Sequence, residues 1–425
     1  MKKFRMNDVI FPLTLLAFEA VGVRYWQVVF NDKTRWLFLA ILLLLVLWRG
    51  GLLLAFRGAL GLVLGTYIFW CTCTTLWSEV PQLSLMKSIA LMVTIPALFG
   101  AGSTWTFNPE RNAPFGFLLP IVVLALFAGL FDRGAAIQGG TIQTYQGLAG
   151  NPNYLGGIVA MSFPYAIWQA YVTRSTGARY LVAWGIVSAL IIVLWLAGSR
   201  ASLLAVLMIF AGFVFALGRG KRTIAVTLIV LSIGAAVAVP AIQASVYERF
   251  VIKGNVETGD AFYTRREVWA ESYELATQGG LTGGGYGVSI GSGDFAGGLT
   301  VVGYGREKGN SQLAVWEETG IVGLALYAML NLTIVLDLGS SLLKIKDEPR
   351  RVELGLLVGT IVGFFVHSVF EAWWGAPGAP EFAFFWSMVG GAYGIVRRNS
   401  IDRRRQRTHF RASPLQADPI AAFKR

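Results

Sequence analysis

Long apolar segments alternate with short polar breaks along most of the 425-residue chain. Segments of about 18 or more residues with few charges are typical of transmembrane helices. Marking each segment and its breaks predicts twelve spans, at residues 9–28, 36–48, 58–77, 83–104, 113–131, 154–173, 179–197, 201–217, 223–240, 313–337, 352–372 and 381–396. The first contains Glu19 and Arg24 and the second is short, so these two fit the pattern least well. The pattern predicts an all-α polytopic membrane protein with about twelve transmembrane helices.

One long polar stretch, residues 241–312, separates the ninth predicted span from the tenth. Its first half has a helical pattern, with four residues on one face: Val268, Ser272, Leu275 and Ala276. Its second half, residues 279–309, has thirteen glycines in 31 residues. A loop of this length in a compact protein is usually functional or disordered. We therefore expect one large loop domain that contains helices.

Composition and charge support a membrane protein and orient it. The chain is 55% hydrophobic and only 14% charged, against roughly 25% charged residues in a soluble protein. From Arg397 onward nine basic residues stand against two acidic ones, so this tail carries seven of the net +12 charges. Such a tail is either a positive-inside topology signal at a cytoplasmic end or a specific binding segment. Nucleic acid is not an expected partner, and the lipid bilayer is.

The bias of basic residues over the short loops places both termini in the cytoplasm and the large loop outside it. The predicted organisation is spans one to nine in 1–240, a periplasmic loop domain in 241–312, spans ten to twelve in 313–396, and a basic cytoplasmic tail in 397–425.

Neither metal nor cofactor chemistry is indicated. Cys71 and Cys73 lie in an apolar run without further ligands, and two histidines in all exclude a histidine-rich metal site. His367 lies near the outer end of the eleventh span, one turn before Glu371 on the same helical face. This pair is either a satisfied contact within the membrane or a functional site.

Three arginines are candidates for anion binding. Arg200 lies in the short turn between the seventh and eighth spans, which keeps it near the outer membrane surface. Arg265 and Arg266 lie in the helical part of the large loop. Guanidinium groups bind phosphate in a bidentate fork without a metal. These residues are either an anchoring residue and ordinary surface charges, or cations that converge on an anionic lipid head.

Four segments, in order along the chain, carry a resemblance to a known family. They are GLAGNPNYLGGIVAMSFP (147–164), GSRAS (198–202), TRREVWAESYELATQGGLTGGGYG (264–287) and GNSQLAVWEETGIVGL (309–324), with LWSEVPQLSLMKS (76–88) as a weaker fifth. Together they resemble the O-antigen ligase and O-antigen polymerase family of bacterial membrane glycosyltransferases. The resemblance runs over most of the chain, and the ordered set is more specific than any one segment.

The resemblance implies an enzyme at the outer face of the bacterial inner (plasma) membrane. It would transfer a glycan from an undecaprenyl-pyrophosphate donor to a carbohydrate hydroxyl during lipopolysaccharide or exopolysaccharide assembly. The acceptor is lipid A-core in a ligase and another lipid-linked glycan in a polymerase. The resemblance places the pyrophosphate on Arg200 and Arg265, with Arg266 as a neighbouring cation, and requires no metal. Additional candidates are His367, Glu371, Asn151 and Asn153.

One position departs from the family pattern. Where the family has a histidine that is thought to activate the acceptor hydroxyl, this chain has Gly309, which cannot act as a base. Our candidate substitute is Glu307, with Asn310 as the second catalytic residue; the alternatives are Glu267, Glu317, Glu318 and His367, and Lys308 is also close in sequence. The chain is therefore expected to be a metal-independent glycosyltransferase. The alternatives are a translocator or transporter of lipid-linked glycans and a non-catalytic member of the family.

Overall fold

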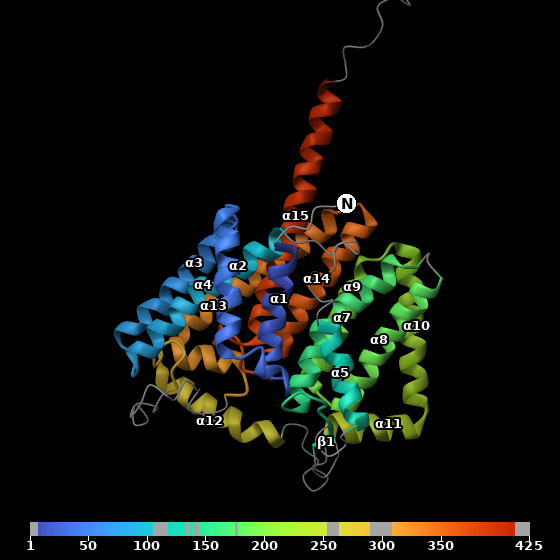
Figure 1. The fold of residues 1–425 in the computed structure, drawn as a ribbon, viewed down its shortest axis with the longest axis horizontal. Coiled ribbons are helices and arrows are strands. Elements are labelled where there is room, and N and C mark those ends of the chain that lie inside the picture. Colours follow the sequence, from blue (N-terminus) through green and yellow to red (C-terminus); the bar gives the residue numbers. More distant parts are fainter. Residues whose placement is uncertain are drawn as a thin grey trace, which may run out of the picture.

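The computed structural model describes residues 7–104, 118–131, 137–138, 144–174, 177–252, 263–289 and 308–412 (Figure 1). A helix coincides with each predicted span: α1 (Asn7–Ala20), α2 (Asp32–Trp48), α3 (Gly58–Cys73), α4 (Pro81–Thr104), α5 (Leu118–Phe131), α7 (Pro152–Val172), α8 (Ala178–Ala197), α9 (Arg200–Ala216), α10 (Arg219–Ala238), α13 (Ser311–Lys344), α14 (Glu348–His367) and α15 (Pro380–Ala412). The other elements are α11 (Pro240–Val246), α12 (Tyr263–Gly279), the 3-10 turns η1 (Trp26–Val28), η2 (Leu52–Leu54) and η3 (Thr74–Leu76), the π-helix η6 (Tyr247–Ile252), and the short antiparallel strands β1 (Ile137–Gln138) and β2 (Thr144–Tyr145). The predicted all-α class is confirmed, and so is the helical pattern that predicted α12.

Four helices in the described residues are long and apolar enough to cross a membrane. They are Gly58–Leu76, Pro81–Thr104, Ala178–Ala197 and Ser311–Lys344. Two shorter helices, Val9–Ala20 and Arg200–Ala216, are also apolar. These helices indicate a membrane protein.

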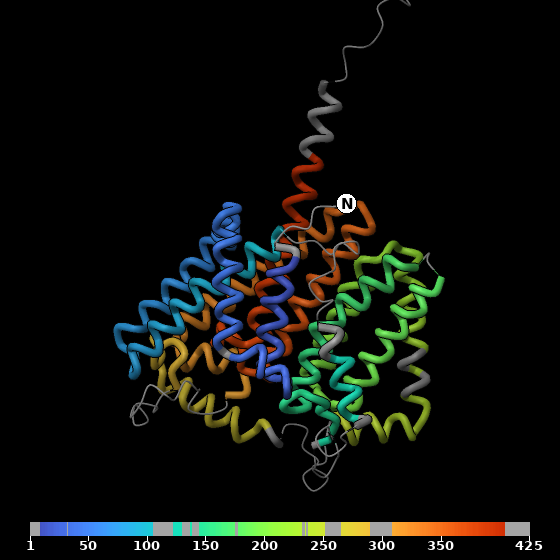
Figure 2. The backbone as a smooth tube through the Cα atoms, in the orientation of Figure 1, coloured from blue at the N-terminus to red at the C-terminus, as the bar shows by residue number. Residues whose placement is uncertain are grey.

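Helices α14 and α15 lie in the middle of the bundle and connect its two sides (Figure 1). Helix α14 packs against α9 on one side, and α15 packs against α4 on the other. The first turn of α1 and the far end of α15 lie at one end of the bundle, whereas α11 and α12 lie at the opposite end (Figures 1 and 2). The helices of the large loop are therefore on the side away from the start of α1 and the end of α15.

The first predicted span is too long at its C-terminal end. Helix α1 ends at Ala20, and residues up to 28 belong to a turn and to η1. The chain turns because its backbone pairs with the segment before α7: Val23 forms an isolated bridge with Ala149, and the Arg24 N–H donates to the Leu148 carbonyl at 2.8 Å. A tertiary contact therefore ends this helix.

The tenth predicted span is interrupted. Helix α13 contains Gly320 with φ 70° and ψ −174°, a backbone conformation that is not helical. A Cβ at this position would lie 2.1 Å from the carbonyl oxygen of Leu281, so glycine is required by both conformation and space. The part of α13 before Gly320 is consequently a separate helical piece that packs against the glycine-rich segment.

The basic stretch after the last predicted span begins as a helix. Helix α15 continues past residue 396 to Ala412 without interruption. Near this end, the Arg350 guanidinium of α14 contacts Asp402 at 2.8 Å.

Candidate functional site

The segments singled out from the sequence meet at the end of the bundle that carries α12. A Cβ on Gly156 in α7 would lie 2.5 Å from the Cβ of Ser199, so α7 packs directly on the turn between α8 and α9. In α12, Trp269 donates through Nε1 to the carbonyl oxygen of Gly309 at 3.1 Å. Each of these contacts joins segments about forty residues apart in the sequence.

Arg265 is at the centre of the polar contacts on this surface. Its Nη2 lies 2.8 Å from Oε1 of Glu371, and the two side chains are 17% and 28% exposed. Asn153 donates through Nδ2 to the same Oε1 at 3.2 Å. The ion pair therefore joins α12, α7 and the connection between α14 and α15, at a border with solvent and not in the apolar core.

Two further predicted residues lie within electrostatic range of Arg265. Burial, and after it the positive charge of Arg265, lowers the pKa of Arg200, which stands at the turn that opens α9. The charge of Arg265 also acts on His367, a buried residue that stacks on Phe364 with ring centroids 5.5 Å apart. We refer to five residues as the Arg265 cluster: Asn153, Arg200, Arg265, His367 and Glu371.

Two predicted asparagines cap helices. The Asn151 side chain accepts a hydrogen bond from the Tyr154 N–H at 2.7 Å and caps α7. The Asn310 side chain accepts from the Leu313 N–H at 2.9 Å and caps α13 in the same way. In this structure both side-chain oxygens position a helix start.

The remaining predicted residues differ in how closely they approach the cluster. Glu307, our candidate base, lies outside the described residues. Arg266 and Glu267 are exposed on α12. Gly309 is adjacent to the cluster, because a Cβ on it would lie 3.1 Å from Nη1 of Arg265. The position where the family pattern has histidine is therefore beside the Arg265 guanidinium.

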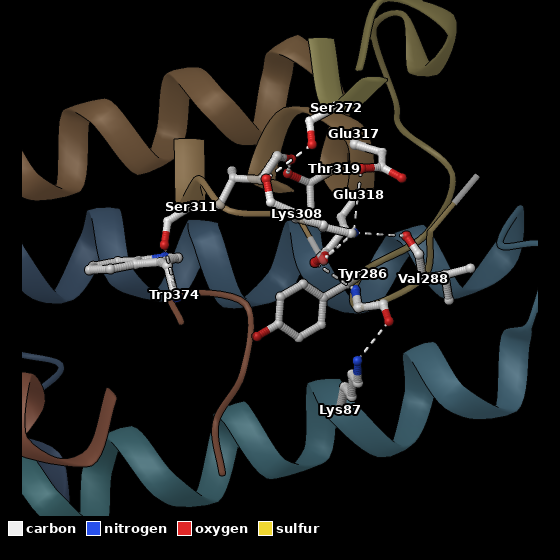
Figure 3. A network of polar contacts seen from close by, with 12 residues as sticks. Lys87, Ser272, Tyr286, Val288, Lys308, Ser311, Glu317, Glu318, Thr319 and Trp374 are labelled. Atoms are coloured by element: carbon white, nitrogen blue, oxygen red, sulfur yellow. Dashed lines mark hydrogen bonds and ion pairs between the residues drawn. The ribbon is translucent and has the colours of Figure 1, made fainter. Parts of the chain in front are cut away.

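Ser311 holds the segment that carries Glu371. Its N–H donates to the carbonyl of Ser368 and its Oγ donates to the carbonyl of Glu371, both at 2.8 Å. The same Oγ accepts from the N–H groups of Trp373 and Trp374, at 3.1 and 3.2 Å (Figure 3). Ser311 at the start of α13 thus fixes the backbone position of Glu371.

A second charged network lies between α13, α4 and the glycine-rich segment, and its Lys308, Glu317 and Glu318 side chains are buried (Figure 3). The Lys308 Nζ lies 2.7 Å from Oε1 of Glu318 and 3.6 Å from Oε2 of Glu317. Oε2 of Glu318 accepts from the Gly287 N–H at 2.8 Å, and the Gly287 carbonyl accepts from Lys87 Nζ at 2.7 Å.

This network corrects the sequence-based alternatives for the base. Glu317, Glu318 and Lys308 have side chains that are at most 1% exposed, and each takes part in the buried ion pairs. A carboxylate that neutralises a buried lysine stabilises the fold and is poorly placed to meet a substrate hydroxyl. We therefore assign Glu317 and Glu318 as counter-ions of Lys308.

Sequence reasoning missed Glu381 at the start of α15. Its carboxylate lies 3.5 Å from the Cβ position of Gly157, and its charge interacts with those of Glu371 and Glu19. Glu381 is therefore a further acidic group within electrostatic range of the Arg265 cluster. A glutamate in the first turn of a helix is common, because it complements the helix dipole, so the sequence signal was weak.

The cluster combines two arginines, a carboxylate, an amide and an imidazole at one end of a bundle that contains membrane-length helices. In the part of the chain that the structure describes, no group of three or more His, Cys, Asp or Glu residues is arranged to bind a metal ion. No protein-family model matches the chain, and no curated protein matches it. The arrangement is chemically suited to an anion that bears two or more negative charges, next to a proton acceptor.

Proposed function

We propose that the chain is a metal-independent membrane glycosyltransferase of the O-antigen ligase or polymerase type. It transfers a glycan from an undecaprenyl-pyrophosphate donor to a carbohydrate hydroxyl, which belongs to lipid A-core or to another lipid-linked glycan. The observation that carries the proposal is the polar cluster around Arg265, whose guanidinium contacts Glu371 at 2.8 Å and which lies within electrostatic range of Arg200. These two cations come from separate elements, α9 and α12, and lie close enough for their charges to interact.

The proximity of two cations has a chemical rationale in this reaction. As the glycosidic bond to the donor breaks, the leaving pyrophosphate gains negative charge, and fixed guanidinium groups stabilise that change. Arg200 at the turn before α9 and Arg265 in α12 are both anchored on helices, so they need little rearrangement to do so. In the absence of an anion the two like charges repel, and Glu371 offsets part of this repulsion.

The proposal also includes twelve spans, a bacterial inner-membrane location and cytoplasmic termini. A helix at each predicted span supports this topology, as does the position of α12 at the end opposite the start of α1.

In a Cys71→Ala/Cys73→Ser background, we expect Glu274→Cys to react with a membrane-impermeant maleimide in intact spheroplasts. Asp347→Cys should react only after lysis. The opposite labelling pattern would invert the topology and remove the proposal.

The function itself is tested with the purified protein in liposomes that contain an undecaprenyl-pyrophosphate-linked glycan and a candidate acceptor. We expect a glycan–acceptor product, formed equally well with and without a metal chelator. Movement of the donor across the vesicle membrane without any product would assign translocation instead. Binding of the donor with neither product nor movement would assign a non-catalytic protein.

A further inference from the structure

We propose that Glu371 accepts the proton of the acceptor hydroxyl, after the donor diphosphate has displaced it from Arg265. This inference rests on the proposed function and deepens it. It assigns the role of proton acceptor to a residue whose position the structure describes, in a chain that has glycine where the family pattern has histidine.

The geometry places Glu371 and position 309 around the same guanidinium. Oε1 of Glu371 lies 2.8 Å from Nη2 of Arg265, and the Cβ position of Gly309 lies 3.1 Å from Nη1. A histidine at 309 would project into the space next to Arg265. The Glu371 carboxylate already occupies another side of that space, so a proton acceptor is present without the histidine.

The contact with Arg265 explains why displacement has to come first. A carboxylate paired with a guanidinium is a weak base, because the ion pair favours its charged form. A diphosphate competes for the same guanidinium with more charge and with oxygens that fit the bidentate fork. Once the diphosphate holds Arg265, the carboxylate loses its cationic partner and its basicity rises. Proton removal is thereby restricted to a protein with an occupied donor site.

The other groups around Glu371 keep it in place. Asn153 in α7 donates to its Oε1, and Ser311 in α13 holds its main-chain carbonyl. Among the described residues, Arg265 places a positive charge against Glu371, and Arg200 lies within electrostatic range of Arg265; His367 in α14 is a further titratable group of the cluster.

The acceptor O–H bond breaks and its proton passes to the Glu371 carboxylate, while the acceptor oxygen forms a bond to the anomeric carbon of the donor glycan. The bond between that carbon and the diphosphate oxygen breaks, and its electron pair leaves with the diphosphate. Arg200 and Arg265 stabilise the charge on the leaving group, and Glu371 then releases its proton to solvent.

The displacement is tested by binding, independently of turnover. The probe is farnesyl diphosphate, titrated into the purified full-length protein in detergent by calorimetry. We expect Glu371→Gln to bind it severalfold more tightly than wild type, because the competing carboxylate charge is gone. Arg265→Ala should bind it at least tenfold more weakly. Glu274→Gln, an exposed change on the same helix, is the matched control and should bind it as wild type does.

The proton transfer is tested by turnover in the liposome assay. We expect Glu371→Gln to lower the rate by about 100- to 10,000-fold, the usual range for loss of general acid–base catalysis. The acid limb of the pH–rate profile should disappear. Glu371→Asp should retain intermediate activity, which separates loss of the base from loss of the fold.

Different results would overturn the role of Glu371 and the proposed function. Weaker farnesyl diphosphate binding by Glu371→Gln would show that the carboxylate only holds Arg265 in place, and would overturn the inference. Wild-type turnover with an unchanged pH profile in Glu371→Gln would also overturn it. If the wild type itself forms no product, the proposed function fails, whereas the binding experiment still tests the exchange at Arg265.

Discussion

Replacement of Arg265 by alanine is expected to reduce glycan transfer by about 100- to 1,000-fold, the loss typical for removing one preorganised group that stabilises charge in the transition state. Arg265 is the residue that links Glu371 to the α12 helix and that interacts electrostatically with Arg200. Under the proposed function, its removal takes away a cation that stabilises the leaving pyrophosphate. The measurement is the initial rate of product formation in liposomes at saturating donor and acceptor.

Two companion variants define this result. Arg265→Lys keeps the charge but loses the bidentate fork, so its rate should fall between those of wild type and Arg265→Ala. Lys33→Ala removes an exposed cation in the first turn of α2 and should leave the rate unchanged. Because the Arg265–Glu371 pair is partly exposed, its loss should cost only about 0–1 kcal/mol of stability, and thermal melting can check this. A fully active Arg265→Ala protein would remove Arg265 from the site.

Replacement of Lys308 by methionine is expected to destabilise the protein by about 3–5 kcal/mol, the range measured when one partner of a buried ion pair is removed. The change leaves the carboxylates of Glu317 and Glu318 buried without their nearest cation. The glycine-rich segment should loosen at the same time, since Glu318 also accepts from the Gly287 N–H. The loss is measured by reversible denaturant unfolding in mixed micelles.

The effect of Lys308→Met is controlled by the same substitution at an exposed lysine. Lys33→Met makes the same chemical change at an exposed lysine and should alter stability by no more than about 0.5 kcal/mol. Adding Glu318→Gln to Lys308→Met should recover part of the loss, because one of the two uncompensated charges is then removed. Equal unfolding free energies for Lys308→Met and Lys33→Met would show that the buried network does not stabilise the fold.

The helical elements follow from local properties of the chain. The apolar runs predicted a helix at each of twelve positions, and a helix is found at each of them, because length and apolar character are properties of contiguous residues. Helix α12 was predicted from the spacing of a few apolar residues. The position of Arg200 at the start of α9 likewise follows from the short turn before it.

At two places the predicted spans differ from the helices, and at each of them a segment distant in sequence packs against the helix. Helix α1 stops at Ala20 because its continuation pairs with residues 148 and 149, and α13 breaks at Gly320 because the glycine-rich segment packs against it. A hydropathy pattern contains no information about such neighbours. Both positions lie at the end of the bundle that carries the Arg265 cluster.

The amino-acid sequence by itself determined the all-helical class, the membrane-length segments and the residue types that can bind an anion. Only the tertiary structure decided which carboxylate meets which cation. Arg265 pairs with Glu371, which is 106 residues away, whereas Glu317 and Glu318 neutralise Lys308 in the interior. In sequence Glu317 and Glu318 are candidates for the base, whereas Glu371 is only an additional candidate for the site. Their roles differ because charge pairing depends on distance and burial in space, and these arise only when the helices pack.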